Sequence, residues 1–148
     1  MSGFIRSTLW ISLSVLFGFG LLYILAGCCY PVDPEEEQPG IEDPSFAEHI
    51  QPIFTASCAL SGCHNAGAAA GLDLRSGLSY AQLVGVASSQ RPSSRRVEPG
   101  DAQNSYLVIK IEGRQSVGSR MPLGGTPLSV EETGTIRNWI GLGAEDNR

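Results

Sequence analysis

The N-terminal segment constrains the fold most strongly, because its composition excludes it from a soluble core. Residues 7–32 carry no charged side chain, and Arg6 precedes an uncharged apolar run over residues 9–26. A positive start, an apolar middle and a small-residue end are typical of a secretory signal. The run is also long enough to span a bilayer, so a retained transmembrane anchor is the alternative. The folding domain is therefore expected in the remaining sequence.

A four-residue motif bears on these two interpretations. The tetrad Leu-Ala-Gly-Cys at residues 25–28 resembles the lipobox of bacterial lipoproteins, in which a peptidase cleaves before a cysteine that carries diacylglycerol. The sequence thus predicts a lipoprotein signal peptide over residues 1–27 and lipidation of Cys28, with a plain cleaved signal as a further alternative. Cys29 follows rather than an aspartate, which in a two-membrane envelope resembles sorting to the outer membrane. The expected location is the bacterial cell envelope, with the lipid anchor in the outer membrane and the protein facing the periplasm or the cell surface.

Residues 28–44 have the composition of an acidic tether. Residues 29–44 hold four prolines, six acidic side chains and no basic one. Proline and like charges extend a chain that has little to bury, although an ordered N-terminal arm is the alternative. Residues 45–148 then hold nine acidic and nine basic side chains, so the predicted domain is neutral. A neutral domain has no basic footprint for nucleic acid, and no such partner is expected.

Four helices are predicted within residues 45–148. Ser45 and Glu48 have the spacing of a capping box, and the apolar stripe behind them predicts a helix over residues 46–57. Apolar patterns followed by glycine predict helices over residues 78–84 and 104–112. A second capping box begins at Ser129, and its helix should end near Gly141 and Gly143. No segment alternates as a strand does, so the expected fold class is all-α, small and loop-rich.

The segment from Cys58 to His64, with Cys63 directly before the histidine, is the most informative motif. A cysteine followed by Cys-His is the arrangement that attaches c-type haem, because two thiols add across the haem vinyl groups and the histidine reaches the iron. The usual spacing between the thiols is two residues, whereas four separate them here. A disulfide is an alternative in an oxidising compartment, as are a zinc site completed by His49 and unrelated surface residues.

The sequence around this motif resembles class I cytochrome c domains, and closely the small bacterial domains described as planctomycete-type or lipoprotein cytochromes c. The matching residues, which cover nearly all of residues 45–148, are 46–54, 58–64, 71–74, 96–101, 105–110, 121–122, 128–129, 132, 136 and 139–141. The resemblance implies a helical domain wrapped around one haem c. Cys58 and Cys63 would form the thioethers, and His64 would be the proximal iron ligand.

The expected distal iron ligand is Met121. Loss of Met1 with the signal would leave Met121 as the only methionine, and it lies in a turn-rich segment rather than a helix interior. A lone methionine there is explained if its sulfur is used, while gap filling in the core is the alternative. The resemblance also places the distal methionine before a proline, as here. His49 is the rival ligand, which would give a bis-histidine site.

Three further residues are expected at the haem. Leu72 and Leu74 would pack against it or belong to the ordinary core, and Arg96, beside Arg95, would pair with a propionate or remain exposed. Two strong axial ligands leave no open position for a substrate, so we expect an electron carrier rather than an enzyme. A haem peroxidase or gas sensor with a labile methionine, and a haem-free lipoprotein stabilised by a disulfide, are the alternatives. The sequence identifies no redox partner.

Overall fold

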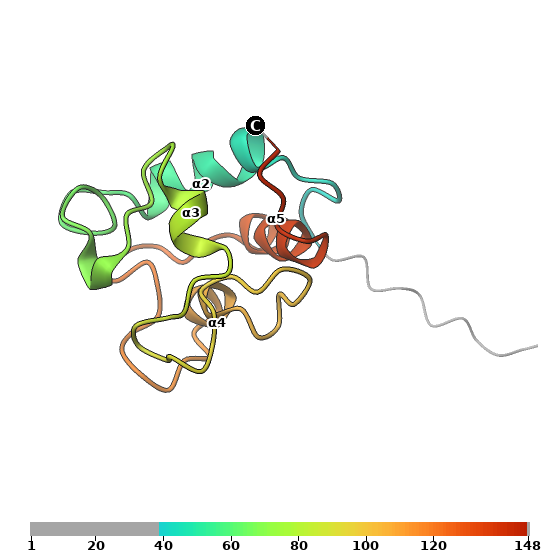
Figure 1. The fold of residues 1–148 in the computed structure, drawn as a ribbon. Coiled ribbons are helices and arrows are strands. Elements are labelled where there is room, and N and C mark those ends of the chain that lie inside the picture. The colour runs from blue at the N-terminus through green and yellow to red at the C-terminus, as the bar shows by residue number, and fades with distance from the viewer. Residues whose placement is uncertain (1–38, 148) are drawn as a thin grey trace, which may run out of the picture. The chain divides into compact units, whose positions relative to one another are not determined.

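The computed structural model describes residues 39–147, which form a helical domain (Figure 1). The α-helices of this part are α2 (Gln51–Ser57), α3 (Ser79–Leu83), α4 (Tyr106–Glu112) and α5 (Val130–Gly141), with a π-helix η1 (Phe46–Ile50) and a 3₁₀ turn η2 (Ala69–Gly71). Residues 39–147 contain no strand, only isolated bridges. The predicted all-α class is confirmed for this part of the chain. The predicted signal peptide, Cys28 and the tether up to residue 38 lie outside the described residues.

The first predicted helix is confirmed, but its start is built differently from the prediction. The Ser45 hydroxyl accepts the Glu48 N–H at 3.4 Å, as in a capping box. The Ser45 N–H, however, donates to Nδ1 of His49 at 2.9 Å rather than to the Glu48 carboxylate. At the same place the Phe46 N–H donates to the Asn147 side chain at 2.6 Å, so the C-terminal segment caps this helix (Figure 1).

The starts of α4 and α5 agree more closely with the prediction from the sequence. The capping box at Ser129 is complete, because its hydroxyl accepts the Glu132 N–H and its own N–H donates to the Glu132 carboxylate. Helix α4 begins at Tyr106, two residues after the predicted start. The preceding residues form a turn in which the Asp101 carboxylate accepts the Asn104 N–H, and this turn replaces the first predicted helical residues.

The core lies where η1, α4 and α5 meet. Helix α5 contacts both η1 and α4 and lies between α2 and α4 in Figure 1. The Phe46 ring packs at 5.2 Å from Trp139 and at 5.3 Å from Tyr80, centroid to centroid, so three elements share one aromatic cluster. Edge-to-face and tilted contacts of this kind add to the burial of apolar area. No helix within residues 39–147 has both the length and the apolar character to cross a membrane.

Residues 39–44 form a short arm that contacts α5. The Ile41 N–H donates to the Thr135 hydroxyl at 3.0 Å, and the Asn138 amide donates to the Ile41 carbonyl at 2.9 Å. The Pro39 carbonyl lies so close to Gly134 that a β-carbon there would be 1.5 Å from the oxygen. Within the described residues, contacts with the domain are therefore already present at Pro39, before Ser45, where the sequence placed the domain boundary.

Candidate functional site

One apolar hollow, open to solvent, lies between the helix ends and the loops. Six of the residues predicted for the site line it: Cys58, His64, Leu72, Leu74, Arg96 and Met121. They come from the end of α2, the loop before α3, the segment before α4 and the loop after it. Leu74, Leu83 and Ile111 line the hollow and also belong to the buried core, so its wall is continuous with the core.

His64 is held in one orientation by the backbone. Its Nδ1 lies 3.2 Å from the carbonyl oxygen of Leu72. A carbonyl oxygen only accepts, so Nδ1 must carry the proton in this contact, which leaves the Nε2 lone pair available to a metal. The loop closes on itself around this contact, because the His64 N–H donates to the Cys58 carbonyl and the Leu74 N–H donates to the His64 carbonyl. A histidine fixed in this way is suited to metal ligation.

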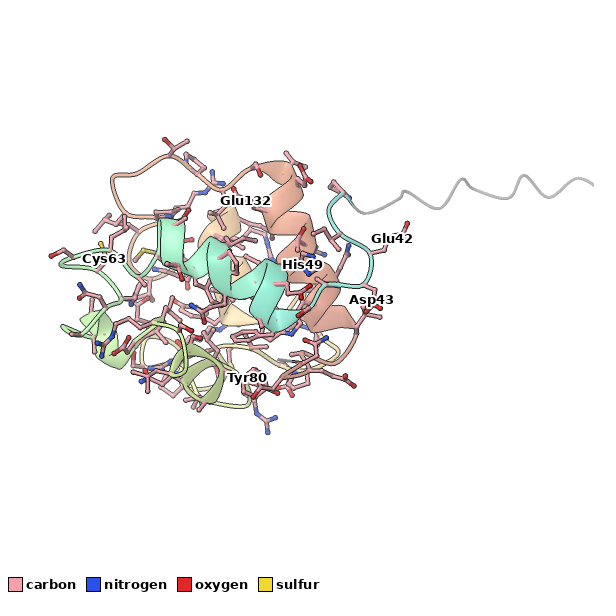
Figure 2. The ribbon with its side chains drawn as sticks, turned by 90° about the horizontal axis from the view of Figure 1, so that it is seen from above. Glu42, Asp43, His49, Cys63, Tyr80 and Glu132 are labelled. Atoms are coloured by element: carbon pink, nitrogen blue, oxygen red, sulfur yellow. The ribbon has the colours of Figure 1, made fainter. Side chains whose placement is uncertain are left out.

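The two cysteines of the motif differ in environment. Cys58 is half-buried and follows the last turn of α2, where its N–H donates to the Phe54 carbonyl. Cys63 is exposed on the outer loop, and both are free thiols in this structure (Figure 2). Burial, followed by the charges of Cys63 and Glu132, raises the pKa of Cys58 from 9.0 to about 11. The Cys58 thiol is therefore protonated at neutral pH.

Met121 is positioned by its backbone. Its N–H donates to the Lys110 carbonyl at 3.0 Å, close to the C-terminal end of α4. The neighbouring Arg120 donates from Nε to the Ile111 carbonyl at 2.8 Å, so two bonds fasten the loop to α4. Met121 is partly exposed and lines the hollow on a chain segment separate from that of His64.

Arg96 lines the hollow but is engaged with the backbone. Its two terminal nitrogens donate to the Gln82 carbonyl at 2.8 Å and to the Gly71 carbonyl at 3.1 Å. The guanidinium thus ties the segment before α4 to η2 and α3 at the wall of the hollow. A role at a propionate stays a prediction.

His49, the rival iron ligand, lies elsewhere. It belongs to η1 and accepts the Ser45 N–H, and it is not among the residues that line the hollow. In Figure 2, His49 and Cys63 lie toward opposite ends of the first helix. Nowhere in residues 39–147 do three His, Cys, Asp or Glu side chains cluster as metal ligands, so the described residues offer no zinc site.

Five polar residues of the wall were not predicted from the sequence: Ser88, Ser89, Gln90, Tyr106 and Lys110. One signal was available, because Lys110 is the only lysine of the chain and lies within the run Val108–Ile111 of otherwise apolar residues. Such a lysine is ordinarily assigned to the solvent-exposed face of a helix. Here it is buried, as are Val108, Ile109 and Ile111.

The donor set fits a covalently attached haem. It combines an oriented imidazole, a methionine on a separate segment and one cysteine, Cys58, on the wall of an apolar hollow, whereas Cys63 is exposed on the loop and does not line the hollow. Imidazole and thioether are the axial ligands of cytochromes c. Protein-family models, curated proteins and solved structures were compared with this chain, and none of them matches it.

Proposed function

We propose that this protein is a membrane-tethered, monohaem c-type cytochrome that carries single electrons between redox partners in the cell envelope. The observation that carries the proposal is the hollow itself. Cys58, His64 and Met121, which the sequence motif and the resemblance to class I cytochromes c assign to haem, line one apolar space. His64 is also held with Nε2 available.

The chain would hold the haem through four residues. Cys58 and Cys63 would form the thioethers, His64 would bind the iron through Nε2, and Met121 would bind through its sulfur. When bound, the haem supplies a one-electron couple that methionine and histidine ligation shifts to higher potential. Leu72, Leu74 and Leu107 would exclude water from one side of the macrocycle.

An electron carrier is favoured over an enzyme because both axial positions would be filled. Transfer of an electron needs no bond making, so the residues have only to bind, orient and keep water away.

The membrane tether is proposed from the sequence. The lipobox-like residues 25–28 and the acidic residues 29–44 would place the domain at the outer membrane of a bacterial envelope. The arm at residues 39–44 would then join the tether to α5.

The experiment is a visible spectrum of the purified full-length protein, oxidised and reduced, with a haem stain after denaturing electrophoresis. We expect haem that stays with the denatured chain, a low-spin spectrum and the charge-transfer band of sulfur bound to ferric iron. A high-spin ferric spectrum would favour a peroxidase or sensor with a labile methionine. A chain without haem after expression with a haem-attachment system would instead be a haem-free lipoprotein.

A further inference from the structure

The hollow contains a buried positive charge. Lys110 is the only lysine of the chain, it is 7% exposed, and it lines the hollow from α4. Lysine is almost never buried to this degree unless its charge is paired. The groups around the ammonium must therefore account for the burial of its charge.

The partners of Lys110 are neutral. Its ammonium donates to the side-chain oxygen of Gln90 at 3.1 Å, and the Tyr106 hydroxyl donates to the same oxygen at 3.2 Å. The Tyr106 ring centre is 6.0 Å from the ammonium, at the outer limit of a cation–π contact. Within residues 39–147 no carboxylate lies within ion-pair distance of Lys110.

A charge buried without an opposite charge is costly. An ammonium has three donors, and one hydrogen bond to Gln90 satisfies only one of them. Removal of one partner from a buried ion pair is strongly destabilising, so buried charges are generally compensated.

The compensating anion must come from the occupant of the hollow. The wall residues that lie with Lys110 are serines, Gln90, Tyr106 and apolar side chains, none of which is acidic. Arg96, the other cation of the wall, already directs its terminal nitrogens to two backbone carbonyls. Lys110 is thus the cation of the wall whose charged end has neither a backbone carbonyl nor a carboxylate as a partner within residues 39–147.

We propose that Lys110 is the anion-binding residue of the hollow and pairs with a carboxylate of the bound molecule, which under the proposed function is a haem propionate. Gln90 and Tyr106 position the ammonium through the shared side-chain oxygen. The inference rests on the proposed function for the identity of the carboxylate. It adds Lys110 to the propionate-pairing role that the sequence predicted for Arg96.

The test uses the full-length holoprotein with ¹³C-labelled propionate carboxyl groups. Redox-difference infrared spectra and reduction potentials are measured for the wild type, Lys110→Met, Lys110→Gln and Lys110→Arg. Arg91→Met is the matched control, because Arg91 adjoins Gln90 in sequence but is exposed and does not line the hollow. We expect one propionate band to shift and the potential to fall in Lys110→Met and Lys110→Gln. Lys110→Arg should restore both, and Arg91→Met should leave the band in place.

Two results would overturn the proposal. One is a set of propionate bands that are the same in Lys110→Met, Lys110→Gln and the wild type. The other is loss of an axial-ligand signal in Lys110→Met with unshifted propionate bands, which would make Lys110 an iron ligand. Absence of covalent haem from the wild type would contradict the proposed function instead, and it is detected before any variant is made.

A second measurement serves where a Lys110 variant retains no covalent haem. Full-length Cys58→Ser/Cys63→Ser chains, with and without Lys110→Gln, are titrated with haem and with its propionate dimethyl ester. The preference for haem over the ester should fall roughly tenfold or more on Lys110→Gln, because a hydrogen bond to a charged group is lost. Equal preferences in the two chains would refute the pairing.

Discussion

At the scale of single residues, the proposed iron site depends most on Met121. The segment that carries Met121 is fastened to α4 through the Lys110 and Ile111 carbonyls, so backbone contacts rather than a rigid helix hold Met121 at the wall of the hollow. A thioether is a soft neutral ligand that favours ferrous iron. The proposed function therefore depends on a side chain whose loss should change the spectrum more than the fold.

Met121→Ala should open the sixth iron position and give a high-spin ferric spectrum without the sulfur charge-transfer band. Met121→His should keep the low-spin state and lower the potential, since axial ligands tune haem potentials over a range of roughly 0.8 V. Visible spectroscopy and redox titration measure both effects. His49→Ala is the control, because His49 bonds Ser45 away from the hollow. An unchanged spectrum in Met121→Ala, together with loss of the low-spin signal in His49→Ala, would contradict the assignment of Met121 as the distal iron ligand.

A second prediction at the residue scale concerns the reactivity of the Cys58 thiol. With its pKa raised to about 11, the thiolate fraction at neutral pH is roughly a hundredfold below that of a thiol at the ordinary value of 9.0. A thiolate of higher pKa is also more nucleophilic, which offsets part of this loss. In haem-free full-length protein, iodoacetamide should therefore modify Cys58 at least roughly tenfold more slowly than in the same chain unfolded in urea. Peptide mass spectrometry after timed quenching gives the rate.

Cys63 provides the internal comparison for this measurement, because it is exposed in the same loop. It should react ahead of Cys58 in the folded chain. Equal rates for Cys58 in folded and unfolded chains would show that the hollow does not shield the thiol.

At the scale of elements, the arm at residues 39–44 depends on the glycine in the middle of α5. A β-carbon at Gly134 would lie 1.5 Å from the Pro39 oxygen and 2.5 Å from the Pro39 carbonyl carbon, and backbone atoms cannot yield by that much. Alanine is otherwise favourable in a helix by about 1 kcal/mol. Gly134→Ala should thus release the arm and leave α5 intact.

The measurement is cleavage after Glu42 by a glutamate-specific protease, which should become faster in Gly134→Ala. Circular dichroism should show that the helix content is retained. Gly141→Ala is the matched control, because Gly141 also lies in α5 but has open space around its β-carbon position. An unchanged cleavage rate in Gly134→Ala would mean that the arm does not depend on this contact.

The elements themselves were largely predictable, and their ends were not. The apolar stripes predicted α4 and α5 and the helix from Phe46 to Ser57, because helical periodicity is a local property. The cap on Phe46 comes from Asn147, a residue 101 positions away, so no local pattern could reveal it. The docked arm likewise depends on empty space at Gly134, which only the packed structure defines.

The candidate site, like the helices, was only partly predictable from the sequence. Cys58, His64 and Met121 were predicted because short sequence motifs indicate their chemistry, and the structure brings all three to one hollow. Lys110 was missed because a lysine on a helix is ordinarily assigned to solvent. Its burial follows from how α4 packs, which buries four consecutive residues, Val108–Ile111.

At the scale of the whole molecule, the predicted lipid anchor would determine where the domain works. Cys28→Ala should abolish acylation and release the protein from the membrane fraction, because the thiol that receives the lipid is lost. Labelling with a palmitate analogue and membrane fractionation measure the two effects. Cys29→Ala, which leaves the lipobox-like tetrad intact, is the control. Labelling that persists in Cys28→Ala would show that this cysteine is not the lipid attachment site.

The continuity of the hollow with the core predicts a large difference in stability between holoprotein and haem-free protein. Leu74, Leu83 and Ile111 belong to both, so without an occupant the hollow exposes part of the core wall to water and leaves the Lys110 charge uncompensated. A group that binds only the native state stabilises it. In a domain of this size each kcal/mol shifts the melting temperature by roughly 4–8 °C. The haem-free full-length chain should therefore melt at least about 10 °C below the holoprotein in calorimetry.

Met121→Ala holoprotein, in which the thioethers and the filled hollow remain, should keep most of that difference. Equal melting temperatures with and without haem would contradict a hollow that is stabilised by its occupant.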